Sequence, residues 1–76
     1  MSELEWMEIF SRNLVDMMKE ARITQHDLSD MIGVSEGTIS KYIHKQRMPS
    51  VKVIINIAYA LDCDFDDLLD FGDMID

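Results

Sequence analysis

A glycine between two short stretches of helical periodicity, within residues 24–43, constrains this chain more than any other feature. Leu28, Met31 and Ile32 recur at spacings of three and four, which predicts an amphipathic helix with these side chains turned inward. Gly33 stands where that helix must end, and glycine adopts the left-handed conformation of a helix end without a side-chain penalty. The stretch therefore predicts two helices joined by a tight turn.

Side chains that cap helices stand at the start of both predicted helices. Thr24 can cap the first, with Asp27 three residues on, and Ser35 can cap the second after the apolar plug Val34. The second helix would turn Ile39 inward with either Tyr42 or Ile43. Its other face is small and polar, and consists of Glu36, Gly37, Ser40, Lys41 and His44. Such a helix, directly after a glycine turn, suits insertion into the major groove of DNA.

Apolar periodicity predicts three further helices, at residues 3–21, 51–61 and 65–71. Ser50 can cap the second of these and Asp64 the third, and Pro49 ends the loop before them. The predicted inward side chains are Phe10, Leu14, Met17 and Ala21, then Val51, Ile54, Ala58 and Leu61, then Leu68 and Leu69. Because Val53, Ile55 and Ile57 make the helix at 51–61 apolar on more than one face, we expect it to be the central and most buried helix.

The length of 76 residues suits a single domain, and we expect residues 1–76 to form one. Cys63 is the one cysteine, so no internal disulfide can form; this fits a reducing compartment, and we expect a cytoplasmic protein. No apolar run approaches the ~18 residues of a membrane span, so no membrane association is expected.

The formal net charge of −8 is unfavourable for nucleic-acid binding, but the charges are unevenly distributed. Residues 1–36 hold three bases and eight acids, residues 37–61 four bases and no acid, and residues 62–76 seven aspartates and no base. The basic block begins on the polar helix face and continues in the loop after it. Because charges beyond ~10 Å are largely screened at moderate salt, local attraction of DNA should outweigh repulsion by the rest of the chain.

A specific combination of residues also carries a resemblance to a known family: Gln25, Leu28, Gly33-Val34-Ser35, Thr38-Ile39-Ser40, Tyr42 and Pro49. These residues resemble the helix-turn-helix of the lambda repressor/Cro type (XRE-like), and residues 57–61 and 65–69 resemble that family's closing helices. The resemblance spans about residues 10–69. It implies an all-α, five-helix DNA-binding domain in which helices 2 and 3 form the helix-turn-helix, at about residues 24–43. The C-terminal helix and tail would occupy residues 64–76.

The resemblance implies roles for individual residues. Gln25 would anchor a phosphate, whereas Glu36, Gly37 and Lys41 would face base edges. Lys41 suits guanine O6 and N7, and Glu36 suits cytosine N4, although Glu36 is equally well explained as an acid favoured by the helix dipole. The flanking and phosphate contacts implied are Ser35, Thr38, His44, Lys45, Arg47 and Lys52.

The sequence departs from that family in three places. Where many members pair an Arg with a Glu, this chain has Met18 and Ile43, and we expect these two apolar side chains to touch. Lys45 and Asp62 stand where the family commonly has glycine. At Lys45 either the helix is longer or the backbone is slightly strained, and Asp62 should tolerate a left-handed conformation.

Several apolar side chains remain for an interface between subunits. Trp6 fits either the edge of the core or a subunit contact. Phe71, Met74 and Ile75 form an apolar strip near the C-terminus, and in similar proteins the final helix commonly forms the dimer contact. We therefore expect a homodimer through these four residues, on a pseudo-palindromic DNA operator with half-sites ~34 Å apart.

The predicted function is a bacterial or phage DNA-binding transcriptional regulator, most simply a repressor, controlled by its concentration or by a partner protein. The alternative is a protein-interaction module of the same fold, whose acidic ends bind a basic partner or mimic DNA, as an antirepressor would.

Metal binding and catalysis are the remaining alternatives. Asp62, Asp64, Asp66, Asp70 and Asp73 have the offsets of an EF-hand loop, but Asp67 replaces its glycine and a Glu is missing at its end. The cysteine and the two histidines, His26 and His44, lack zinc-ligand spacing. No nucleophile is paired with a base, so neither enzyme activity nor a cofactor is expected.

Overall fold

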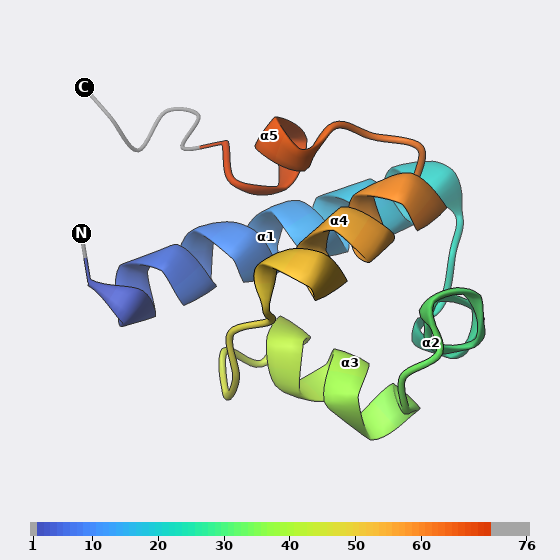
Figure 1. The fold of residues 1–76 in the computed structure, drawn as a ribbon, viewed down its shortest axis with the longest axis horizontal. Coiled ribbons are helices and arrows are strands. Elements are labelled where there is room, and N and C mark those ends of the chain that lie inside the picture. The colour runs from blue at the N-terminus through green and yellow to red at the C-terminus, as the bar shows by residue number, and fades with distance from the viewer. Residues whose placement is uncertain (1, 71–76) are drawn as a thin grey trace.

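The computed structural model describes residues 2–70, which contain five helices joined by short loops (Figure 1). They are α1 (Glu3–Ala21), α2 (Gln25–Ile32), α3 (Glu36–Ile43), α4 (Val51–Ala60) and α5 (Phe65–Leu68). In the view of Figure 1, α3 lies along one side of the molecule and α5 along the opposite side, with α1 and α4 between them. The predicted all-α fold with five helices is confirmed.

The first four helices each begin at a hydroxyl cap. The side-chain oxygens of Ser2, Thr24, Ser35 and Ser50 accept hydrogen bonds from the backbone amide three residues on, at 3.1–3.3 Å. At the start of α2 the Asp27 carboxylate also accepts from the Thr24 amide at 3.1 Å, which completes a capping box. The caps predicted at Thr24, Ser35 and Ser50 are confirmed.

The same four helices end alike, in a left-handed residue followed by a 6→1 hydrogen bond. The left-handed residues are Arg22 (φ 58°), Gly33 (φ 73°), Lys45 (φ 62°) and Asp62 (φ 53°). The amide of the next residue donates to the carbonyl five residues back, at 2.8–3.2 Å. This pattern is the Schellman motif. Left-handed conformations were predicted at Gly33 and Asp62 and as one alternative at Lys45, but not at Arg22.

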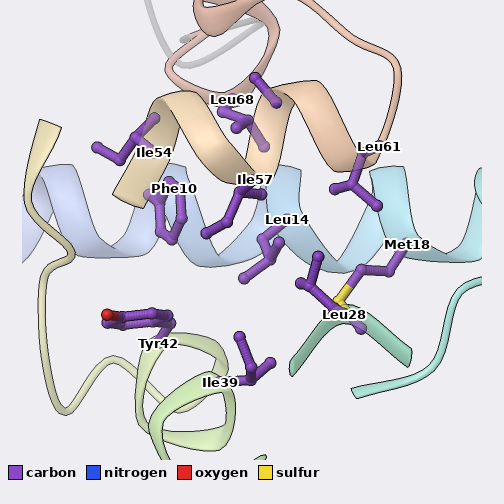
Figure 2. Close-up of a cluster of buried hydrophobic side chains, with 11 residues drawn as sticks. Phe10, Leu14, Met18, Leu28, Ile39, Tyr42, Ile54, Ile57, Leu61 and Leu68 are labelled. Carbon is purple, nitrogen blue, oxygen red and sulfur yellow. The ribbon is translucent and has the colours of Figure 1, made fainter. Parts of the chain in front are cut away.

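The core lies where all five helices meet (Figure 2). Its largest fully buried side chains are Ile9, Phe10, Leu14, Leu28, Ile39, Ile57 and Leu68. The Phe10 and Tyr42 rings pack edge to face with centroids 6.3 Å apart, which joins α1 to α3. The core therefore holds α3 by its inward face.

Two residues before Gly33 were predicted to point into the core but do not. Ala21 is exposed, and Met18 is buried in the last turn of α1 instead. Met31 is 53% exposed, because α2 meets the core mainly through Leu28 and, less deeply, Ile32. On these helices the apolar residues outnumber the positions that neighbouring helices cover.

α4, expected to be the central and most buried helix, leaves one face exposed. Val51, predicted to point inward, is 63% exposed, and Ile55 and Tyr59 share its outward face at spacings of four. Ile57 is fully buried with Ile54, Ala58 and Leu61. Near-continuous apolar sequence hides the helical period here, so only the packing decides which face is covered.

The last helix is shorter than predicted. α5 ends at Leu68, whereas the sequence predicts a helix to residue 71. Leu68 is fully buried and Leu69 half-buried, as expected, and α5 contacts α1 and α4. The side-chain amide of Asn13 in α1 donates to the backbone carbonyls of Leu68 and Asp70 at 3.0 and 2.9 Å. These hydrogen bonds join the end of α5 to α1. The predicted interface residues Phe71, Met74 and Ile75 lie outside the described residues.

Candidate nucleic-acid interface

The helix pair α2–α3 and the loop after it carry the polar and basic residues singled out in the sequence. Ile39 and Tyr42 are buried on the inward side of α3, so Tyr42 rather than the half-buried Ile43 completes that face. On the outward side, Glu36, Gly37, Lys41 and His44 are exposed and Ser40 is half-buried. The helix thus turns a small, polar face to solvent.

The remaining predicted DNA contacts lie around this face. Lys45 and Arg47 are exposed in the loop after α3, and Lys52 is exposed in the first turn of α4. Gln25 is half-buried at the start of α2. At the start of α3, the hydroxyls of Ser35 and Thr38 bond to each other at 2.9 Å.

His44 is tied to the helix that it follows. Its Nδ1–H donates to the Ser40 carbonyl at 2.8 Å, and the same nitrogen lies 3.2 Å from the Ser40 hydroxyl. This contact covers a carbonyl at the end of α3. Because Nδ1 is engaged, Nε2 is the ring atom left for another partner.

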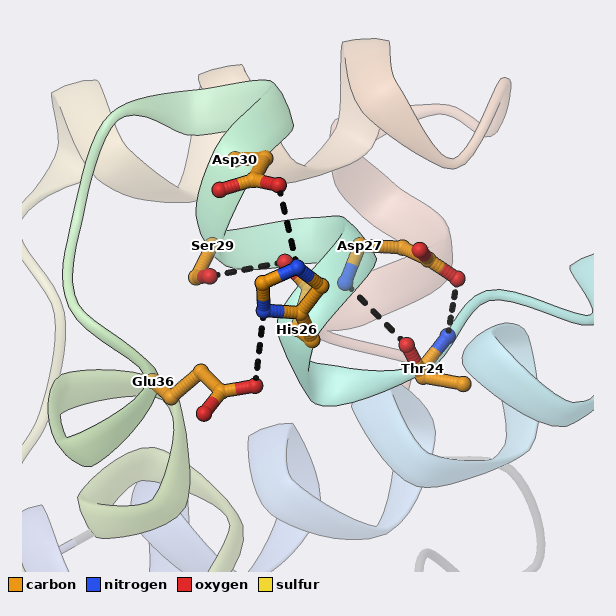
Figure 3. A network of polar contacts seen from close by, with 6 residues as sticks. All are labelled: Thr24, His26, Asp27, Ser29, Asp30 and Glu36. Carbon is orange, nitrogen blue, oxygen red and sulfur yellow. Dashed lines mark hydrogen bonds and ion pairs between the residues drawn. The ribbon is translucent and has the colours of Figure 1, made fainter.

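Glu36 has a partner that the sequence reading missed (Figure 3). The His26 ring of α2 lies between two carboxylates: Nδ1 is 3.1 Å from Glu36 Oε1 and Nε2 is 3.3 Å from Asp30 Oδ2. The spacing of four between His26 and Asp30 is visible in the sequence, but the contact to Glu36 depends on the angle of the turn. The first residue of α3 is therefore bridged to α2.

The acidic end of the described chain lies away from α3. α5 contacts α1 and α4, whereas α3 contacts α1 and α2, so α1 stands between α3 and α5 (Figure 1). Two packed helix layers separate charges by roughly 16–20 Å. Since the Debye length is about 8 Å at physiological salt, the aspartates around α5 repel an anion at α3 only weakly.

An apolar groove lies between α1 and α3, at the positions where the family resemblance implies an ion pair. Met18 and Ile43 both line this groove, with Val15 and Ile23. Lys19 and Gln25 also line the groove, so it extends to Gln25, the predicted phosphate anchor. Direct contact between Met18 and Ile43 stays a prediction.

Cys63 and the aspartates around α5 show no arrangement for catalysis or metal binding in the described part of the chain. Burial raises the pKa of the Cys63 thiol, and the neighbouring Asp67, Asp64 and Asp62 raise it further, so the thiol stays protonated and is a poor nucleophile. α5 occupies the middle of the aspartate spacing that resembles an EF-hand loop, and within residues 2–70 no three acidic, histidine or cysteine side chains are placed to hold a metal ion. Over the same residues, no helix is both long enough and apolar enough to cross a membrane.

Comparison with known proteins agrees with this geometry. A family model described as helix-turn-helix matches residues 14–68. The chain belongs to the helix-turn-helix family. The resemblance to the lambda repressor/Cro type is confirmed, and the match runs from the second half of α1 to the end of α5.

A curated relative carries the same helix-turn-helix. It is described as an uncharacterized HTH-type transcriptional regulator, YqaE, of Bacillus subtilis (strain 168), and it is 34% identical over 61 residues. The match covers 80% of this chain and 53% of the relative, so the helix-turn-helix chain spans about half the length of that protein.

Proposed function

We propose that this protein is a sequence-specific DNA-binding transcriptional regulator that inserts α3 into the major groove. One observation carries the proposal: a helix held by its apolar face after a left-handed turn exposes a small, polar face that runs into a basic loop. Residues 37–61 contain four bases and no acid. Family membership and the description of the Bacillus subtilis relative as a transcriptional regulator support the same function.

The roles within the interface follow from side-chain chemistry. Lys41 donates to guanine O6 and N7 on the floor of the groove, and the absent side chain of Gly37 lets the backbone approach the bases closely. Gln25 and the start of α2 bind one phosphate. The phosphates that flank the groove are met by Ser35, Thr38, His44, Lys45, Arg47 and Lys52.

The proposed assembly is a homodimer that represses transcription from a pseudo-palindromic site. Two copies of α3 then enter successive major grooves ~34 Å apart on one side of the duplex. Trp6 is half-buried, so its side chain is partly covered within the subunit, and it lines a surface pocket with Asp66 and Leu69. Its contribution to the dimer is therefore smaller than that of a fully exposed tryptophan.

A DNA titration tests the proposal. Labelled duplexes selected from a random pool are titrated at low and moderate salt with wild type, Lys41→Ala and Arg47→Ala. Removing the Arg47 charge should weaken binding to all sequences and reduce the salt slope by about one. Removing Lys41 should cost about 1–3 kcal/mol at one base pair and relax the preference there.

The control changes the net charge by the same single unit on the far side of the molecule. Asp66→Asn on α5 should leave both the affinity and the salt slope nearly unchanged, since α1 separates α5 from α3. If wild type binds no duplex even at low salt, the regulator proposal fails. In that case the acidic surface around α5 favours the second candidate, a protein-interaction module that binds a basic partner.

A further inference from the structure

We propose that His26 is a positioning residue that fixes the Glu36 carboxylate at the start of α3 and thereby sets the base preference opposite Glu36. This inference rests on the proposed DNA-binding function. It adds a residue outside α3 to the determinants of specificity, and it makes one part of that specificity depend on pH.

Both ring nitrogens of His26 face a carboxylate oxygen. Carboxylates only accept hydrogen bonds, so each contact is attractive only while the facing nitrogen carries a proton. Only the imidazolium ion has both protons. The charged groups that face the ring are Asp30 from α2 and Glu36 from α3, with Asp27 beside it on α2 (Figure 3).

The position of the contact connects it to DNA reading. Glu36 is the first residue of α3, directly after the cap Ser35, and this end of the helix enters the groove in the proposed complex. His26 engages Oε1 of Glu36, which leaves Oε2 to accept from the amino group of cytosine. The positive ring also offsets the repulsion that a carboxylate would otherwise experience beside phosphates.

The exposure of the contact suits a switch rather than a structural support. The His26 side chain is 69% exposed and that of Glu36 is 55% exposed. Exposed ion pairs add little to folding stability, so losing this one leaves the fold intact. A neutral ring has a single N–H and can donate to only one of the two carboxylates, so the contact depends on the charge of the ring.

Base preference is the measurement that separates this role from a structural one. Binding sites are selected from a random duplex pool at about pH 5.5 and about pH 8, with wild type, Glu36→Ala, His26→Ala and His26→Lys. The position at which Glu36→Ala abolishes the preference identifies the base pair opposite Glu36. There, His26→Ala should lower discrimination by about tenfold at the lower pH while the position read by Lys41 is unchanged.

The pH profile and a rescue variant complete the test. Wild type should discriminate better at the lower pH, because the imidazolium holds Glu36; His26→Lys, which is charged at both pH values, should discriminate equally at both. His44→Ala is the matched control, since it removes the other histidine: it should weaken binding to all sequences and keep the preference opposite Glu36.

Three results overturn the inference. In the first, His26→Ala keeps the preference opposite Glu36 within about twofold while Glu36→Ala loses it. In the second, His26→Ala lowers base discrimination equally at every position of the binding site, which indicates a general structural effect. In the third, wild type binds no duplex, and then the proposed function fails together with the inference; in the first two, DNA binding by wild type shows that only the inference has failed.

Discussion

Backbone conformation at single residues has measurable consequences, and the two glycines of the helix pair provide a matched test. Gly33 is left-handed (φ 73°) and a Cβ built there meets nothing within 4 Å, so Gly33→Ala adds backbone strain alone. We expect this variant to lose about 1–2 kcal/mol of unfolding free energy. Gly37 is inside α3, where its Cβ would lie 3.8 Å from Ser35 Oγ, an ordinary contact.

Gly37→Ala should therefore change stability in the opposite direction, by less than about 1 kcal/mol, because alanine loses less backbone entropy than glycine in a helical conformation and Gly37 is in the first turn of α3. Urea unfolding of both variants without DNA measures the two effects. Unchanged stability of Gly33→Ala would show that the turn does not need a left-handed residue at Gly33.

The capping carboxylate at Asp27 makes stability depend on pH. The hydrogen bond from the Thr24 amide lowers the pKa of this carboxyl, and the bond with the Thr24 side chain lowers it further. Because the pKa is lower in the folded state, the stabilisation is complete above the ordinary carboxyl range, near pH 4, and is lost as the pH falls through the folded value. Asp27→Asn should remove this part of the acid dependence.

Thermal unfolding between about pH 2 and pH 7 checks that expectation. Wild type should lose stability on acidification below about pH 4 more steeply than Asp27→Asn. The exposed Asp16 of α1, for which the structure gives no cap role, is the matched control, and Asp16→Asn should retain the wild-type acid dependence.

Hydrogen-bonded residues at helix ends were also the most predictable from the sequence. Thr24, Gly33, Ser35 and Ser50 act through atoms within three to five residues of themselves, so local chemistry identifies them. The bridge from His26 to Glu36 joins two helices across a turn, and its partner depends on an angle that no local pattern encodes.

At the scale of the helices, α5 tests how much a short element contributes. Leu68 is fully buried where α5 meets α1 and α4, whereas its neighbour Leu69 is half-buried. Leu68→Ala leaves a cavity in the core and should cost about 2–5 kcal/mol, and Leu69→Ala should cost clearly less. Denaturant unfolding compares the two, and a similar loss in both would mean that α5 packs differently from the structure.

The existence of all five helices and most of their boundaries could be predicted, apart from the end of α5, but the covered faces could not always be. The predicted helix at residues 3–21 agrees with α1 at both ends. For α4, five of the first seven residues are aliphatic, so its sequence fits several orientations. The positions of α1, α2 and α5 expose Val51 and Ile55 and bury Ile57, and those positions are a property of the whole core.

At the scale of the whole molecule, salt should affect folding and DNA binding in opposite directions. A net charge of −8 destabilises the compact state by self-repulsion, so added salt should raise the unfolding temperature. Binding at the basic loop releases counterions, so the same salt should weaken the complex. Thermal melts and DNA titrations over about 50–200 mM salt measure both. Salt that weakens both alike would argue against a basic interface separate from the acidic side.

The charge segregation itself was predicted from the sequence, but its spatial arrangement was not. Counting charges identifies an acid-free segment and an aspartate-rich segment. Only the packing of α1 between α3 and α5 separates the first part of the acid-free segment from the aspartates; α4, the last part of that segment, contacts α5 directly.

The shared Schellman endings of α1 to α4 have a consequence for molecular recognition. Three of their four left-handed positions are occupied by Arg22, Lys45 and Asp62, which have fewer accessible backbone conformations than glycine. The backbone at these three helix ends therefore has less freedom than glycine would give it, and Lys45 restricts the end of α3, whereas the turn before α3 contains Gly33. Little conformational entropy remains to be lost on association, so the heat-capacity change of complex formation should reflect the buried surface alone rather than coupled folding.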